Sequence, residues 1–181
     1  MELVSTLERT KTYNMIDVNT FIDSYSTKLY RFCLKITYAK EDAEDLFQDT
    51  WFSILQKQEK LQAAENPQKF LYTTALSLWK SKQRKYARRK RIAPELSLDA
   101  GADILLIEKE QGVEDALIQK AEQEFIHGLV DKLHEKHRIP LILYYTVGMD
   151  ISEIAEILDL PPGTVKSRLY TARQEIKKGM K

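Results

Sequence analysis

The chain has 181 residues, of which 43% are hydrophobic and 30% are charged, and its net charge is +1. This composition is typical of a globular protein and excludes a disordered or fibrous chain. The single cysteine, Cys33, excludes an intrachain disulfide and a cysteine-rich zinc site.

The near-neutral charge is unevenly distributed along the chain. Residues 1–91 carry a net charge of +6, residues 92–124 carry −7 and residues 125–181 carry +2. This pattern indicates two modules and an acidic connector, and it fits either nucleic-acid contact or plain solvated faces. No apolar run approaches the length of about 20 residues that a membrane span requires, and the start lacks a signal-peptide pattern. We therefore expect a soluble protein of a reducing, cytoplasmic compartment.

The first module has the apolar spacing of a helical bundle. Apolar residues recur at steps of three and four over residues 21–36, as one buried helix face requires. Pro67 disfavours helix at Asn66, so we expect a loop over Gln58–Gln68 and a new helix from Pro67. No segment alternates with period two, which favours an all-α fold. Between these two helices, a second apolar face is expected at Leu46, Phe47, Trp51, Phe52, Ile54 and Leu55.

Two small helical domains are expected in all. The first covers residues 1–91 and the second covers residues 113–181, where helical spacing resumes. Residues 92–112 contain proline, glycines and several acids, and are expected to form the linker. Within the second domain, a helix is expected over Pro140–Val147.

The segment Asp150–Arg173 has the pattern of a helix-turn-helix. Ser152 is expected to cap the first helix, and the small Ala155 suits a close helix crossing. The turn is expected at Asp159-Leu160, and the second helix starts at the two prolines that follow. Basic and hydrogen-bonding side chains on the outer face of that helix suit the DNA major groove, whereas an ordinary helical hairpin is the alternative. These outer residues are Lys166, Ser167, Tyr170, Thr171, Arg173 and Gln174.

The run from Gly163 to Tyr170, GTVKSRLY, resembles the promoter-recognition helix of bacterial sigma factors, specifically of the extracytoplasmic-function class. The preceding segment Ser152–Leu158 is similar to the first helix of that motif. Asp159 stands where the family usually has glycine, and aspartate tolerates a left-handed backbone less well. The resemblance implies that this helix binds the upstream promoter element. Base contacts are then expected from Lys166, Ser167, Tyr170 and Thr171, and phosphate or structural contacts from Arg168 and Arg173.

A cluster of acids over Asp42–Asp49 opens the second helix of the first module. From the residues alone, it fits a carboxylate metal site, charges that complement the helix dipole, or a docking face. The sequence DAEDLFQD is similar to the sigma-factor segment that binds the clamp of the largest catalytic subunit of RNA polymerase. The resemblance implies polymerase contacts from Asp42, Glu44, Asp45, Gln48 and Asp49.

Eight of the twelve residues from Lys80 to Arg91 are basic. This density indicates a phosphate-binding stripe, with a solvated helix or a site for an acidic protein as the alternative. In sigma factors this stretch follows the melted promoter, and the loop at residues 59–68 lies where a flipped base is captured. Tyr72 and Trp79 fit either base stacking or the core. The residues assigned to the downstream element are Lys80, Arg84, Lys85, Arg88 and Arg89.

The resemblance implies a sigma factor that binds core RNA polymerase and promoter DNA, uses no cofactor or metal, catalyses no reaction itself and is controlled by an anti-sigma factor. Ser77 and Ser81 stand where relatives often have Asn and Asp, so the promoter sequence is expected to differ. One alternative is a helix-turn-helix regulator that binds duplex DNA without polymerase. Another is a metal-dependent nuclease built on the acidic helix. Cys33 lies in an apolar stretch and is expected to pack in the core.

Overall fold

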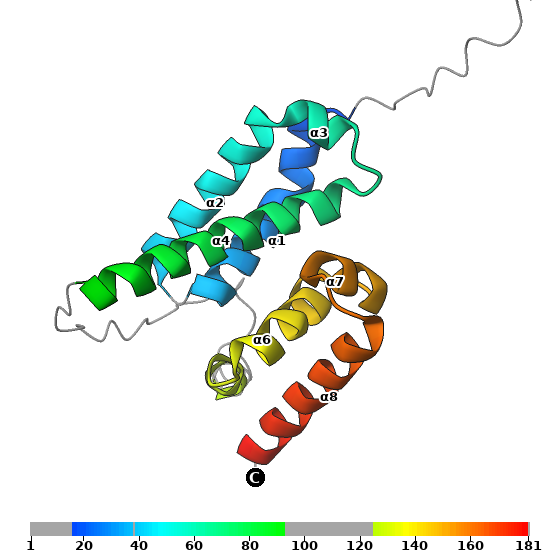
Figure 1. Cartoon of the computed structure of the whole chain (residues 1–181). Coiled ribbons are helices and arrows are strands. Elements are labelled where there is room, and N and C mark those ends of the chain that lie inside the picture. The colour runs from blue at the N-terminus through cyan, green and yellow to red at the C-terminus, as the bar shows by residue number, and fades with distance from the viewer. Residues whose placement is uncertain (1–15, 38, 93–124, 181) are drawn as a thin grey trace, which may run out of the picture.

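The computed structural model describes residues 16–37, 39–92 and 125–180. Within these residues every regular element is helical, and the helices form two packed domains (Figure 1). The expected all-α fold with two small helical domains is confirmed. The expected linker over residues 92–112 lies outside the described residues, apart from its first residue, which ends a helix.

The described part of the N-terminal domain contains four helices: α1 (Val18–Thr37), α2 (Lys40–Gln56), α3 (Gln58–Gln62) and α4 (Pro67–Ile92). α1, α2 and α4 pack on one another, and the short α3 joins α2 to α4 (Figure 1). The stretch expected to be a loop is thus helical in its first half. The start of α4 at Pro67 agrees with the prediction.

The core of this domain confirms the predicted face of α1. Phe21, Leu29, Phe32 and Ile36 are buried. Cys33 is also fully buried, and burial raises the pKa of its thiol to about 12, so it packs in the core as expected.

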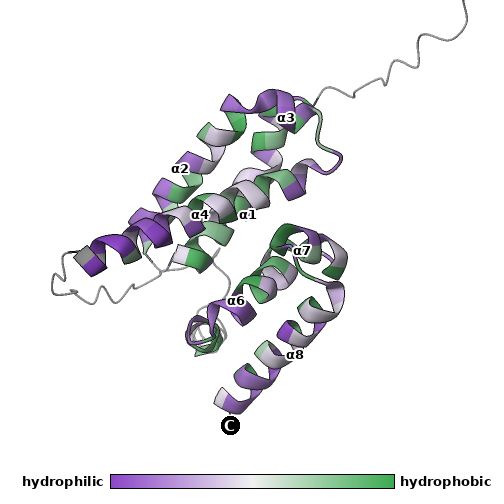
Figure 2. Cartoon of the chain, in the orientation of Figure 1, coloured by the Kyte–Doolittle hydropathy of each residue, from purple (hydrophilic) through white to green (hydrophobic). Residues whose placement is uncertain are grey.

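The aromatic residues of α4 also belong to the core. Tyr72 and Trp79 are both buried, which decides against base stacking for these two side chains. Burial raises the pKa of the Tyr72 hydroxyl, which packs edge-on against Phe32. Figure 2 shows that α4 becomes hydrophilic toward its C-terminal end, beyond these residues.

The predicted apolar face of α2 is partly wrong. Leu46, Trp51 and Ile54 are buried as expected, but Phe52 and Leu55 are 64% and 48% exposed. Each exposed residue directly follows a buried one, and one residue turns a helix by about 100°, so both fall beside the buried stripe.

The C-terminal domain comprises a helical segment at residues 125–131 and the elements α6 (Glu135–Ile142), η1 (Leu143–Val147), α7 (Ile151–Leu158) and α8 (Pro162–Gly179). η1 is a π-helical turn that continues directly from α6. α8 packs on α6 and α7.

The helix expected over Pro140–Val147 begins earlier than predicted, at Glu135. His134 caps it, because its Nδ1 accepts the backbone N–H of Lys136 at 3.2 Å. Pro140 lies inside α6, where it cannot donate to the carbonyl of Lys136. Proline favours a first helical turn, which is why the sequence pattern placed the start too late.

The two domains contact each other directly. α1 packs on η1 and α6, and α4 packs on α7 (Figure 1). Arg138 of α6 is 2% exposed, and burial lowers the pKa of its guanidinium to about 10. Across the described parts of the chain, no helix combines the length and apolar character that crossing a bilayer requires.

Candidate functional site

The first helix of the predicted helix-turn-helix is α7, and it begins with a capping box. Asp150 Oδ1 accepts the Glu153 N–H at 2.8 Å, and Glu153 Oε2 accepts the Asp150 N–H at 2.9 Å. The expected cap, Ser152, instead lies exposed inside the helix. The sequence does contain a signal for Asp150 as the cap, because Asp150 and Glu153 have the spacing of a capping box. Such a box satisfies two backbone N–H groups rather than one.

The turn between α7 and α8 is tight. Asp159 has φ 54° and ψ 55°, which is the left-handed conformation that glycine adopts more readily than other residues. The Leu160 N–H then donates to the Ala155 carbonyl at 2.9 Å, and Pro162 begins α8. Ala155 is buried, as the close crossing of the two helices requires.

α8 has one buried face and one polar face. Val165, Leu169 and Ala172 are buried against the rest of the domain. Tyr170 is 62% exposed. On the predicted DNA-reading face, Lys166, Ser167, Tyr170 and Arg173 are exposed, whereas Arg168 and Thr171 are half-buried.

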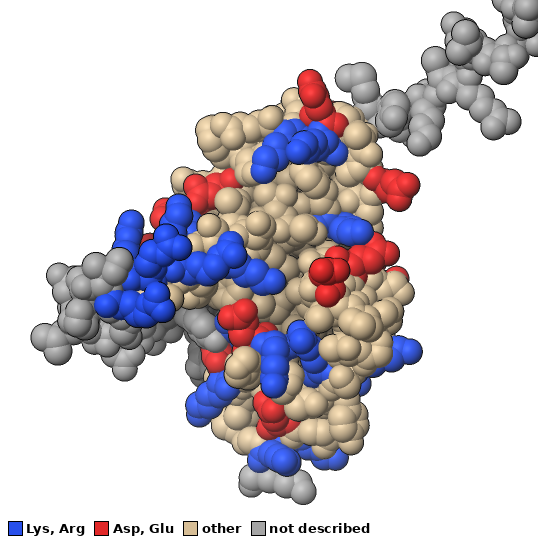
Figure 3. Space-filling view, viewed as in Figure 1, with Lys and Arg blue, Asp and Glu red and all other residues tan. Residues whose placement is uncertain are grey.

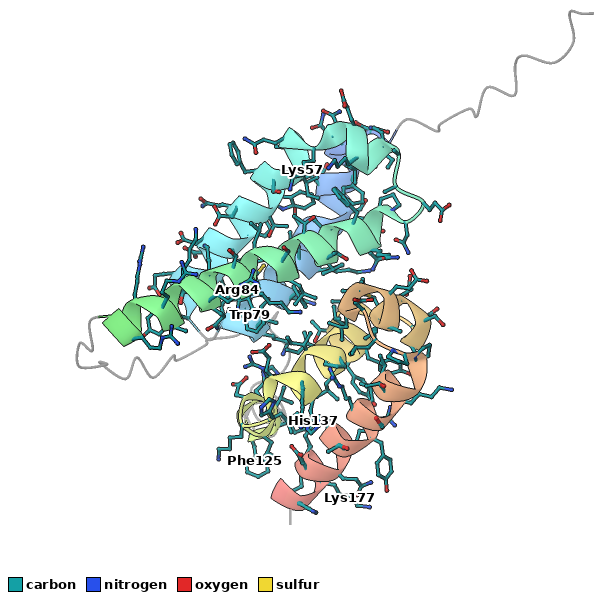
Figure 4. The ribbon with its side chains drawn as sticks, in the orientation of Figure 1. Lys57, Trp79, Arg84, Phe125, His137 and Lys177 are labelled. Carbon is teal, nitrogen blue, oxygen red and sulfur yellow. The ribbon has the colours of Figure 1, made fainter. Side chains whose placement is uncertain are left out.

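The basic end of α4 forms a second candidate surface. Figure 3 shows lysine and arginine side chains gathered over the C-terminal part of this helix. Figure 4 labels Arg84 in this part, beyond the buried Trp79. Ser77 is exposed and Ser81 is half-buried on the same helix. All five residues assigned to the downstream element are exposed: Lys80, Arg84, Lys85, Arg88 and Arg89.

The acidic face of α2 forms the third surface, and all five of its predicted residues are exposed. Lys82 of α4 lies 2.9 Å from Asp49 and 3.9 Å from Asp45. Glu44 lies 3.8 Å from Lys40. Asp42 and Gln48 make no hydrogen bond or ion pair within the described residues.

Sequence reasoning missed two members of this third surface. Phe52 and Leu55 follow Gln48 along α2 at steps of four and three, so they extend the acidic face with exposed apolar area. Trp51 and Ile54 already fill the buried stripe of α2, so the apolar residues next to them, Phe52 and Leu55, could have been predicted to be exposed. Of the residues that the structure describes, no group of three or more His, Cys, Asp or Glu side chains is arranged to hold a metal ion.

Comparison with known proteins assigns both domains. Residues 21–89 match the family Sigma-70 region 2, and residues 126–176 match Sigma-70, region 4. The ECF RNA polymerase sigma factor SigW of Bacillus subtilis is 26% identical over 162 residues, which cover 88% of this chain and 87% of SigW. SigM of the same organism is 26% identical over 163 residues, which cover 88% of this chain and 93% of SigM.

The chain belongs to the extracytoplasmic-function sigma factors. As such, it directs transcription initiation by RNA polymerase and is a non-catalytic subunit of that enzyme. A regulator built on the helix-turn-helix alone does not account for the region 2 match.

The sigma factor also resembles a solved structure in its fold. The sigma factor RpoE of Bartonella quintana, solved in complex with the anti-sigma factor NepR, gives a TM-score of 0.76 at 21% identity. The match covers 91% of this chain and 96% of that chain, so it includes both domains.

Proposed function

We propose that α2 docks this sigma factor on the clamp of the largest catalytic subunit of core RNA polymerase. The observation that supports this most is the exposed acidic face of α2, continued by exposed Phe52 and Leu55. Carboxylates give charge complementarity and orientation, whereas the two apolar side chains add area that is removed from water on docking. The polar contacts are assigned to Asp42, Glu44, Asp45, Gln48 and Asp49.

α8 binds the upstream promoter element in the major groove. Its buried stripe fixes the helix, and its exposed side chains provide hydrogen-bond donors and an aromatic ring for base edges. The base contacts are assigned to Lys166, Ser167, Tyr170 and Thr171, and phosphate or structural contacts to Arg168 and Arg173.

The N-terminal domain opens the downstream element. The basic end of α4 binds phosphates, and the turn before α4 captures a flipped base. Ser77 is exposed on α4 and takes the place of the relatives' Asn in base readout. Its short hydroxyl side chain predicts a downstream element that differs from those of relatives.

Regulation by an anti-sigma factor completes the proposal. It is supported by the fold shared with a sigma factor that was solved with the anti-sigma factor NepR. The proposal also takes residues 1–91 and 113–181 as the two functional domains, residues 92–112 as the linker, and the cytoplasm as the compartment in which polymerase is bound.

Transcription in vitro tests the proposed function. Core RNA polymerase and genomic DNA fragments are incubated with and without the protein, and RNA start sites are mapped. New starts that share a two-part upstream motif are expected. If no new starts appear although the protein binds duplex DNA, the proposed initiation function is wrong and a duplex-binding regulator is favoured.

A second experiment tests the docking face. Asp42→Lys reverses an exposed charge on α2, and Asp23→Lys makes the same change on an exposed position of α1. Core polymerase is expected to retain the Asp23 variant and to lose the Asp42 variant in a pull-down. Equal retention of both variants would remove α2 from the interface.

A further inference from the structure

A polar bridge joins the two domains where the N-termini of α4 and α7 meet. Asn66 Nδ2 donates to Glu153 Oε1 at 3.3 Å, across 87 residues of sequence. Lys69 Nζ lies 2.5 Å from Glu156 Oε2. The turn and first residues of α4 therefore contact acidic side chains of the helix-turn-helix.

Local structure on both sides orients this bridge. Asn66 Oδ1 caps α4 by accepting the Lys69 N–H at 2.9 Å, so the amide nitrogen of Asn66 is directed to Glu153. Glu153 uses its other oxygen in the capping box with Asp150. Both groups of the bridge are thus held by helix caps before the domains meet, which reduces the entropy lost on closing.

A second set of contacts holds the other end of the same domain boundary. Buried Arg138 of α6 donates from Nη2 to the Ile36 carbonyl near the end of α1, at 3.5 Å. A cation is favourable at a helix C-terminus. Burial raises the pKa of the Asp131 carboxyl, and Lys35 of α1 opposes that rise. The boundary therefore has a buried contact at α1 and a partly exposed one at α4.

We propose that Glu153 and Glu156 compete with single-stranded DNA for the start of α4, so that the closed free protein binds single strands weakly until its domains separate. The amide of Asn66 is suited to base edges and the ammonium group of Lys69 to phosphates. In the closed protein both groups are bound by glutamate carboxylates instead. The inference rests on the proposed function, which assigns flipped-base capture to the turn before α4.

The bridge is weak enough to open and close reversibly. The side chains of Lys69 and Glu156 are 37% and 60% exposed, and exposed ion pairs are weak and sensitive to salt. The apparent affinity for single strands is then the affinity of the open form multiplied by the fraction of molecules that are open. Removing the Glu156 charge is expected to tighten binding by about twofold to fivefold.

Closure is tested by energy transfer between dyes on Thr27→Cys of α1 and Gln174→Cys of α8. Both positions are exposed, whereas the native Cys33 is buried and does not compete for the dyes. Lys69→Glu and Glu156→Lys are each expected to lower the transfer efficiency, and the double charge swap to restore it. Unchanged efficiency in both single variants, or no restoration in the swap, overturns the bridge.

Competition is tested by the fluorescence anisotropy of a labelled oligo(dT) strand, without polymerase. Glu156→Gln is expected to bind it more tightly than the wild type, whereas the control Glu175→Gln, on α8, binds as the wild type does. Glu175 lies 3.3 Å from His137 within the C-terminal domain, so its charge is not part of the bridge. Equal affinities of the Glu156 and Glu175 variants overturn the competition.

The two proposals fail in different ways. If the start of α4 does not contact single strands, Glu156→Gln still lowers energy transfer but leaves oligo(dT) affinity unchanged. If the sigma function itself is wrong, the protein with core polymerase produces no new RNA starts, whatever the dyes report.

Discussion

α8 and the second half of α4 are both basic helices, but they hold their charges differently. α8 buries Val165, Leu169 and Ala172, so the domain core sets its rotation and directs its outer side chains one way. In α4, every side chain over residues 83–89 is exposed, so charge is present all around the helix. Charge on all sides attracts phosphates without selecting bases, whereas a packed helix holds a few side chains against base edges. Burial rather than charge therefore distinguishes a helix suited to reading sequence from one suited to attracting DNA.

The largest effect is expected from removing the packing of α8. Leu169 is 1% exposed, and Leu169→Ala is expected to lower the free energy of unfolding by about 2–5 kcal/mol through lost burial and a cavity. Arg88→Ala on α4 is expected to change it by less than about 0.5 kcal/mol. Urea unfolding measures both, and similar losses in the two variants would contradict the comparison.

Next in size is the loss of base contacts. Lys166→Ala combined with Tyr170→Ala is expected to weaken promoter binding by about 1–3 kcal/mol per lost contact. Core polymerase binding is expected to stay unchanged, because docking is assigned to α2 and both side chains are exposed, so their loss leaves the core of the domain intact. Promoter-specific transcription and a core pull-down measure the two effects. Loss of core binding in this variant would count against the assignment of α8.

Removing charge from α4 is expected to act on salt dependence instead of sequence preference. Replacing Arg84, Lys85, Arg88 and Arg89 by Gln removes four phosphate contacts, so the slope of log affinity for duplex DNA against log salt falls in magnitude by about 3.6. The preference for the upstream element over random duplex is retained. Titrations at several salt concentrations measure the slope, and an unchanged slope would rule out phosphate contacts by this end of α4.

The smallest effect concerns the turn that positions α8. Asp159→Gly relieves a left-handed non-glycine residue and is expected to raise the free energy of unfolding by about 0.5–1 kcal/mol. The control is Gly148→Ala, at a glycine with φ 83° where an added Cβ meets no atom within 4 Å. Backbone strain alone then predicts a loss of about 1 kcal/mol. Thermal unfolding distinguishes the two, and a destabilised Asp159 variant would indicate that its side chain supports the turn.

Local sequence signals predicted much of the candidate site. The α7–α8 motif was recognisable because capping, turn and helix-start preferences act over a few residues. The choice of Ser152 over Asp150 was wrong because two capping residues stand close together and the capping-box spacing of Asp150 and Glu153, which favours Asp150, was not weighed. Pro140 misled for a related reason, since proline is tolerated inside α6 where tertiary packing supports the helix.

By itself, the sequence determined the all-α class, the position of the helix-turn-helix and the charged segments, because helical periodicity and charge density are local properties. Only the tertiary structure decided that Tyr72 and Trp79 belong to the core and that Lys82 lies beside Asp45 and Asp49. The contact between Asn66 and Glu153 could not be predicted from the sequence either. Each of these depends on how helices distant in the sequence pack together, which neither periodicity nor composition encodes.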